Sequence, residues 1–377
     1  MHFERRGGRG AYNRCFAYFR ALRDGSVART EGRTAMPVGG EGYEAARRGF
    51  GWGAVADRAA IDVAGPDAAA FLQNLLSNDV ASLEAGAGRF ACFLTPKARI
   101  VAPLEVLRLG AERFWLLAPP GAASRCAQEL ARRVFVKRVE VAERPLMGWA
   151  FEGPQAAEAM EQLGFEGAAE PQQPLSHGTI ELAGRPLRAV RMGLVPGSWR
   201  LWAESSEDED AAVELEREIA ARIGASAQAR LGAQALETLR IEAGVPRWGA
   251  EIDSESFLPE TGLERTHVSY TKGCYPGQEP VARVHFKGRT HRTIGLVALG
   301  PGQEVPAAGT VLYGEDGKER GRVTSAVWSP ALGRPLALAV IRREIEPVGS
   351  VSRLGAADGP VVETVAAPLG GQAAARS

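Results

Sequence analysis

The chain has 377 residues, of which 45% are hydrophobic and 24% charged, a composition typical of a soluble globular protein with two or three packed domains. Lysine plus arginine equals aspartate plus glutamate, 45 against 45, so the overall charge predicts neither a direct nucleic-acid partner nor an anionic membrane. The apolar runs are too short for a membrane span or a signal peptide, which predicts a cytoplasmic protein, or a mitochondrial matrix protein in a eukaryote.

The first part of the chain predicts an arm and then a compact α/β lobe. Residues 1–40 are rich in arginine and glycine and indicate a flexible basic arm. Residues 41–145 alternate strand and helix patterns, in the order expected of a split β-α-β plan. The expected elements are strands at 59–64, 90–94, 100–107 and 114–117, and helices beginning after Gly65-Pro66 and spanning 122–135.

A similar order recurs in residues 146–290, which we assign to a second lobe. The repeat is one of topology and not of sequence. A helix is expected to begin at Ser206, which can cap it, and the acidic residues 207–210 lie in its first turn, where the helix dipole favours negative charge. The expected elements are strands at 146–151, 185–191 and 199–203, and helices at 154–163, after 206 and ending at Gly244.

Residues 291–367 change character, because short strands alternate with turns such as Glu315-Asp316-Gly317. Regular strands at this spacing predict a small antiparallel β-barrel. The tail 368–377, rich in glycine, alanine and glutamine, is expected to be disordered.

Cysteine usage points to a reducing compartment. The four cysteines are widely separated and form neither a C-x-x-C pair nor a zinc-site spacing. His267, His285 and His291 likewise fit no metal signature. One thiol could only share an iron-sulfur cluster with a partner protein, because cluster ligation takes several thiolates.

The stretch KGCYPGQE, 272–279, places Cys274 on a tight loop. Pro276 and Gly277 suit the central positions of a type II turn, and Gly273 is expected to let the backbone pass close to a neighbour. The lysine at 272 would favour the thiolate of Cys274. A working thiol and a small buried hydrophobe beside a structural turn both fit this pattern.

Upstream, the stretch RIEAGVPRWG carries Arg240 and Glu242 on a helix that ends at Gly244. Two residues apart, these charges do not share a helix face, so each needs a separate partner. They suit ligand binding, or contacts that brace one domain against the next.

Together these motifs resemble the signature of the YgfZ-type folate-binding proteins, relatives of the glycine-cleavage T-protein that support iron-sulfur enzymes. The resemblance rests on KGCYPGQE with its flanks, RIEAGVPRWG, the LPE at 258–260, GRVTSAVWSPALG and, near the start, FLQNLLSNDV. It implies an α+β fold: a three-lobed ring of two ferredoxin-like lobes and a C-terminal antiparallel β-barrel around a central site for tetrahydrofolate or a derivative.

Carried over by position, the resemblance gives Cys274 the reactive role. The motif-loop residues are Lys272, Gly273, Tyr275, Gly277, Gln278 and Glu279, and the folate-binding candidates are Arg240, Glu242 and Arg283. The predicted function is that of a monomeric folate-binding accessory protein for assembly, maintenance or repair of iron-sulfur clusters. Its partners would be client or carrier proteins, with a cluster held transiently.

The alternative is a tetrahydrofolate-dependent aminomethyl or one-carbon transferase. Two departures from the transferase pattern weigh against it. Ala102 and Pro103 stand where the catalytic aspartate is expected, and neither can exchange a proton. The segment 192–201, which presents a pterin-binding glutamate in the T-protein, contains no acid.

Overall fold

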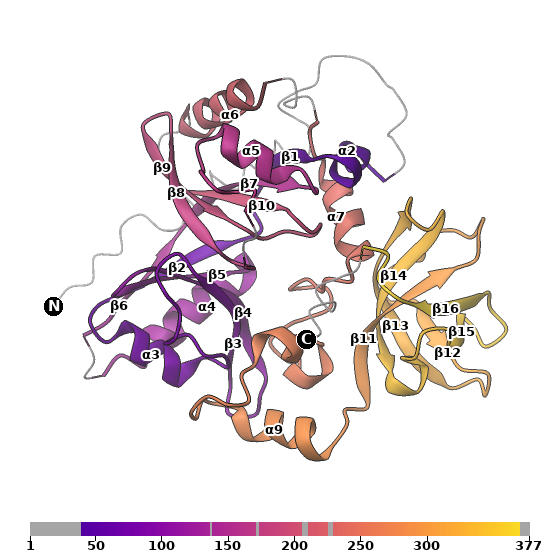
Figure 1. The fold of residues 1–377 in the computed structure, drawn as a ribbon. Coiled ribbons are helices and arrows are strands. Elements are labelled where there is room, and N and C mark those ends of the chain that lie inside the picture. Colours follow the sequence, from indigo (N-terminus) through magenta and orange to yellow (C-terminus); the bar gives the residue numbers. More distant parts are fainter. Residues whose placement is uncertain (1–38, 136–137, 171–172, 206–209, 225–228, 370–377) are drawn as a thin grey trace.

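The computed structural model describes residues 39–135, 138–170, 173–205, 210–224 and 229–369. Two α/β lobes and a barrel surround a central opening (Figure 1). This confirms the predicted α+β class with a C-terminal antiparallel barrel. Among the described residues, no helix is long and apolar enough to cross a membrane. Most of the arm, most of the tail and the expected cap Ser206 lie outside the described residues.

The first lobe is a five-stranded antiparallel sheet in the order β3-β4-β5-β2-β6. Its core forms because one face of the sheet alternates apolar residues that pack against two helices with apolar faces. The elements are β2 (Ala59–Ala64), α3 (Ala68–Leu75), β3 (Gly88–Leu94), β4 (Ile100–Gly110), β5 (Arg113–Ala118), α4 (Pro120–Ala131) and β6 (Glu140–Arg144).

The second lobe is a five-stranded antiparallel sheet in the order β1-β7-β10-β9-β8. All seven residues of β7 are buried, so this strand needs neighbours on both edges and cover on both faces. The elements are α2 (Tyr43–Arg48), β1 (Gly51–Val55), β7 (Leu146–Glu152), α5 (Ala156–Gln162), β8 (His177–Leu182), β9 (Arg185–Val190), β10 (Trp199–Glu204) and α6 (Asp210–Ile223).

Strand β1 crosses the boundary that we predicted between the lobes. It lies within residues 41–145, yet it pairs with β7, with Val55 opposite Gly148. The short glycine-containing segment Gly51–Val55 shows no strong strand pattern, so the sequence did not indicate it. The first lobe is therefore inserted between two neighbouring strands of the second.

The two sheets face each other across an apolar interface, which we call the inter-lobe interface. It joins residues of β2, β4 and β5 in the first lobe to residues of β1, β7, β9 and β10 in the second. Its buried residues are Val55, Ala60, Leu107, Trp115, Leu117, Leu146, Ala150, Leu175, Val190 and Trp202. Because both sheets bury this face, the first two lobes are fixed relative to one another.

A helical segment leads from the second lobe to the barrel. It contains α7 (Ala233–Glu242), η2 (Leu258–Glu260), α8 (Glu264–His267) and α9 (Gln278–Lys287). The closed barrel follows in the order β11-β14-β13-β12-β15-β16. Its elements are β11 (Arg292–Leu299), β12 (Val311–Tyr313), β13 (Glu319–Ser329), β14 (Arg334–Arg342), η3 (Arg343–Ile345), β15 (Val351–Leu354) and β16 (Val361–Val365).

Candidate functional site

The three lobes enclose a cavity of about 2060 Å³. The first lobe contributes Phe90 and Pro103, the second Met192, and the barrel Thr293, while the segment 243–249 crosses between them. The volume is at least twice that of a typical small-molecule site, roughly 300–1,000 Å³. A folate-sized ligand would therefore fill only part of it.

On the first-lobe wall, Arg58 and Glu105 form a closed ion pair. The Nε and Nη2 atoms of Arg58 donate to the two carboxylate oxygens of Glu105 at 2.8 and 2.7 Å. Glu105 lies on β4 two residues after Pro103, and both line the cavity. Since alternate residues of a strand share a face, the cavity does contain an acid close to the position where Pro103 stands. Ala102 is fully buried in the core of the lobe.

On the second-lobe wall, Glu152 binds the start of the segment 192–201, which contains no acidic residue. Its Oε2 accepts hydrogen bonds from the backbone N–H groups of Leu194 and Val195, and Oε1 accepts one from Arg200 at 2.5 Å. Glu152 is fully buried, whereas Leu194 and Arg200 line the cavity. Glu152 therefore positions cavity-lining residues without lining the cavity itself.

Arg240, one of the predicted folate ligands, lines the cavity but is saturated with protein partners. Its Nε and Nη2 donate to Glu237 at 2.9 and 2.7 Å, and its Nη1 donates to Glu251 and to the carbonyl of Val245. Glu251 also accepts a hydrogen bond from Ser325 of the barrel. These contacts fit the bracing interpretation better than a free anion receptor.

Glu242 braces the barrel in the same way. One oxygen accepts a hydrogen bond from Tyr43 of α2, and the other accepts from Ser329 and from the backbone of Ala331. The carboxylate is fully buried, so it faces no ligand. The prediction that Arg240 and Glu242 have separate partners is confirmed.

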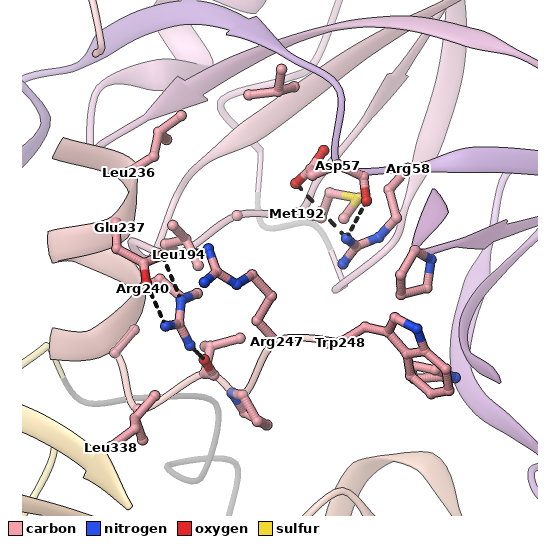
Figure 2. Close-up of a pocket in the computed structure, with 18 of the residues that line it drawn as sticks. Asp57, Arg58, Met192, Leu194, Leu236, Glu237, Arg240, Arg247, Trp248 and Leu338 are labelled. Carbon is pink, nitrogen blue, oxygen red and sulfur yellow. Dashed lines mark hydrogen bonds and ion pairs between the residues drawn. The ribbon is translucent and has the colours of Figure 1, made fainter. Parts of the chain in front are cut away.

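Arg247 and Trp248 are cavity residues that we did not single out, although both lie in the quoted motif RIEAGVPRWG. Figure 2 shows both side chains extending from one backbone segment into the cavity. The side chain of Arg247 is 54% exposed and pairs with the carboxylate of Glu237 at 3.1 Å. The segment thus offers a cationic group on one side of the backbone and an aromatic surface on the other.

His267 also lines the cavity, next to Phe90, with ring centroids 5.1 Å apart. Burial lowers the pKa of His267 to about 4, so the ring is neutral near pH 7. Its Nδ1 atom lies 2.8 Å from the hydroxyl of Thr266. This histidine is therefore an uncharged, hydrogen-bonded residue of the cavity wall.

The KGCYPGQE loop lies outside this cavity, since none of its residues is part of the lining. The ammonium of Lys272 donates to the carbonyls of Gln73, Leu76 and Asn78 at 2.6, 2.6 and 3.0 Å. These carbonyls lie at the C-terminus of α3 and just after it, where backbone acceptors lack partners within the helix. Burial lowers the pKa of Lys272 to about 8. Lys272 thus anchors the loop to the first lobe, and its activation of Cys274 stays a prediction.

Gly277 makes the second attachment of the loop. Its φ of +84° and ψ of +3° and the hydrogen bond from Gln278 to the carbonyl of Tyr275 confirm the predicted turn. A Cβ atom at Gly277 would lie 2.6 Å from the carbonyl oxygen of Thr95, in the β3–β4 turn. Glycine is therefore required for the loop to approach the first lobe this closely.

The prediction that Gly273 lets the backbone pass close to a neighbour is wrong. Its φ is not positive, and a Cβ atom built there meets nothing within 4 Å. Gly273 lies on the open side of the loop beside Cys274, and both residues are exposed. Close packing therefore begins only at Tyr275, which is buried.

Cys274 differs from the other described cysteines in its exposure. Cys92 and Cys126 are buried, and burial raises the pKa of both thiols well above the usual range. Among the described residues, no group of three or more histidine, cysteine, aspartate or glutamate side chains could hold a metal ion. The structure thus presents Cys274 to solvent.

Three further predicted site residues lie on α9, away from the cavity. Arg283 pairs with Glu279 at 3.0 Å, and both side chains are strongly exposed. Arg283 does not line the cavity, so it is not positioned to hold a ligand there. Gln278 begins α9 directly after Gly277.

The comparisons with known proteins agree with this architecture. Residues 9–272 match the GCVT N-terminal domain, and residues 291–368 match the glycine cleavage T-protein C-terminal barrel domain. An aminomethyltransferase of Corynebacterium jeikeium is 28% identical over 321 residues, or 80% of each chain. An aminomethyltransferase of Bacillus subtilis is 24% identical over 315 residues, which cover 82% of this chain and 84% of that protein.

A solved structure gives the same result for the fold. The glycine cleavage system aminomethyltransferase T from Bartonella henselae superposes with a TM-score of 0.78 at 22% identity. The match covers 92% of this chain and 95% of that chain. All three lobes are therefore shared.

Proposed function

The chain belongs to the glycine cleavage T-protein family, and on this premise we propose that it is a folate-binding accessory protein of the YgfZ type. It acts in the assembly, maintenance or repair of iron-sulfur clusters in client enzymes. The observation that carries this proposal is the placement of Cys274: an exposed thiol, outside the cavity, on a loop fixed at two points to another lobe.

A loop that is anchored in this way favours a working thiol over a packing residue. The contacts of Lys272 and Gly277 hold the loop, and the adjacent Gly273–Cys274 segment makes no such contact. In the proposed reaction the Cys274 thiolate supplies one ligand to a cluster, its proton passes to solvent, and the partner protein supplies the remaining ligands. Client and carrier proteins are therefore the expected partners.

The folate would bind in the cavity, apart from the thiol. We assign its aromatic ring system to Trp248 and its glutamyl carboxylate to Arg247, because Arg240 is already paired and Arg283 lies outside the lining. Arg247→Ala should weaken binding of 5-formyltetrahydrofolate by roughly 5- to 30-fold, measured by quenching of tryptophan fluorescence. Arg283→Ala is the matched control, and equal effects of the two variants would refute this placement.

A transferase remains the second candidate, and Glu105 is the observation that favours it. The carboxylate lines the cavity on the same strand face as Pro103, and the compared relatives are named aminomethyltransferases. Both of its oxygens accept hydrogen bonds from Arg58, however, so the carboxylate is engaged within the protein and is not directed at a ligand. We therefore expect no turnover of an aminomethyl donor with tetrahydrofolate.

Two variants separate these functions. In cells that lack the protein, Cys274→Ser should fail to restore the activity of iron-sulfur enzymes, whereas Glu105→Gln should restore it if it folds normally. The purified wild-type protein should show no transfer above the uncatalysed rate. Transfer that Glu105→Gln abolishes and Cys274→Ser leaves intact would establish the transferase instead.

A further inference from the structure

The inter-lobe interface ends in a group of charged and polar side chains that we call the inter-lobe rim: Asp62, Arg113, His177 and Arg188. None of them lines the cavity. Asp62 and Arg113 come from β2 and β5 of the first lobe, and His177 and Arg188 from β8 and β9 of the second. The rim therefore connects the two lobes at a place that belongs neither to the cavity nor to the thiol loop.

The alternation of β9 places Arg188 in the rim. Leu187 and Ala189 point into the core that the second-lobe helices cover, whereas Val190 belongs to the inter-lobe interface. Arg188 shares the face of Val190, and its neighbour across the ladder is Trp202, another interface residue. The guanidinium thus lies against the apolar part of the interface.

Arg188 has no carboxylate partner in the part of the chain that the structure describes. Its Nη1 atom donates a hydrogen bond to Nδ1 of His177 at 3.4 Å, and its buried Nε atom has no acceptor among the described residues. The ring of His177 donates from Nε2 to the carbonyl of Ala87 at 3.2 Å, which leaves Nδ1 as the acceptor for Arg188. Burial, followed by the charge of Arg188, lowers the pKa of His177 to about 4. The histidine therefore brings no charge of its own to the site.

The nearby acids are already in use. Asp62 accepts hydrogen bonds from Nε and Nη2 of Arg113 at 2.9 and 2.8 Å, and it lies 3.6 Å from Arg144. Glu204 lies 3.9 Å from Arg113. Three arginines thus face two carboxylates, and the remaining positive charge lies with Arg188. Its pKa is lowered by burial and then by the charge of Arg113.

A partly buried cation without an anionic partner costs stability, and a bound anion removes this cost. The planar guanidinium also offers two parallel N–H groups, the geometry that phosphate and carboxylate oxygens fit. We propose that Arg188, together with the unused Nη1 of Arg113, binds a small oxyanion at the inter-lobe rim. The anion would connect β9 with β5 and so stabilise the contact between the two lobes.

The test compares inorganic phosphate with chloride at equal ionic strength. Phosphate should raise the Tm of the wild-type protein by about 3 °C at a hundredfold excess over its Kd. Arg188→Gln should abolish this rise, and in chloride it should be at least as stable as the wild type because a buried unpaired charge is gone. The control Arg322→Gln changes an exposed barrel arginine that pairs with Glu319, and it should retain the full effect of phosphate.

Two further measurements complete the test. Line broadening of the phosphate ³¹P resonance at 25 °C reports binding to each folded variant independently of Tm. A triglutamate peptide replaces phosphate in a parallel series, and the ligand with the larger shift identifies the source of the oxyanion. No shift with either ligand, or an equal shift in Arg188→Gln, would overturn the proposal.

Discussion

Substitution of Gly277 by alanine tests whether the thiol loop depends on its fit against the first lobe. The new Cβ atom would lie 2.6 Å from the Thr95 carbonyl oxygen and 3.1 Å from the Ala98 Cα atom. Ordinary contacts begin near 3.4 Å, so backbone must move by about 0.8 Å. A positive φ adds about 1 kcal/mol for a residue with a side chain, and the overlap roughly 1–3 kcal/mol.

We therefore expect Gly277→Ala to lower the free energy of unfolding by about 2–4 kcal/mol, measured by denaturant titration. Hydrogen exchange of the amides of residues 275–281 should accelerate, because the loop is displaced from the β3–β4 turn. Gly273→Ala is the matched control within the same loop, since its Cβ atom meets nothing within 4 Å. It should change stability by less than about 0.5 kcal/mol.

The outcome that would refute this reasoning is an equal effect of the two substitutions. A neutral Gly277→Ala variant would show that the close approach to Thr95 does not hold the loop. If Gly277→Ala is destabilised as expected but still restores iron-sulfur enzymes in cells, the contact between the loop and the first lobe is dispensable for function.

Three further predictions use the same purified protein. Cys274→Ser should leave the Tm within about 1 °C of the wild type because the thiol is exposed, whereas Cys92→Ser should cost roughly 1–3 kcal/mol of stability; the reverse order would make Cys274 a packing residue. Lys272→Met should cost about 2–3 kcal/mol in a denaturant titration, since three carbonyls lose their donor, and a change below about 0.5 kcal/mol would contradict that anchor. His177 and His267 have folded pKa values of about 4, below the usual value, so the unfolded chain binds more protons between pH 6.5 and 4. Protonation of each histidine in the unfolded chain should therefore lower the free energy of unfolding by about 1–2 kcal/mol from pH 7 to pH 5. In urea titrations at the two pH values, His177→Gln should reduce this pH dependence.

Local patterns predicted the parts of the structure that local interactions determine. The Pro-Gly turn followed from the φ that proline fixes and the positive φ that glycine allows, and Gly277 adopts it. The separate partners of Arg240 and Glu242 followed from helix geometry alone. The barrel followed from the regular spacing of strands and turns, as its closed strand order confirms.

Long-range contacts account for what the sequence did not reveal. The acceptors of Lys272 lie 194–199 residues earlier in the chain, so no local pattern could separate a helix-capping lysine from one that activates a thiol. The same holds for Glu105, whose partner Arg58 is 47 residues away. The motif RIEAGVPRWG contains Arg247 and Trp248, so the sequence did mark this segment. That their side chains point into the cavity depends on the turn after α7.

The insertion of the first lobe into the second has a consequence for the order of synthesis on the ribosome. Strand β1 ends at Val55 and its partner β7 begins at Leu146, so 90 residues must be translated before the two can meet. At roughly 5–20 residues per second this takes about 5–18 s, which leaves time for the inserted lobe to fold first. Both connections then run side by side, since Val55 faces Gly148 and Ala60 faces Arg144. A nascent chain truncated before β10 should therefore contain a protease-resistant first lobe and a second lobe that is still unformed.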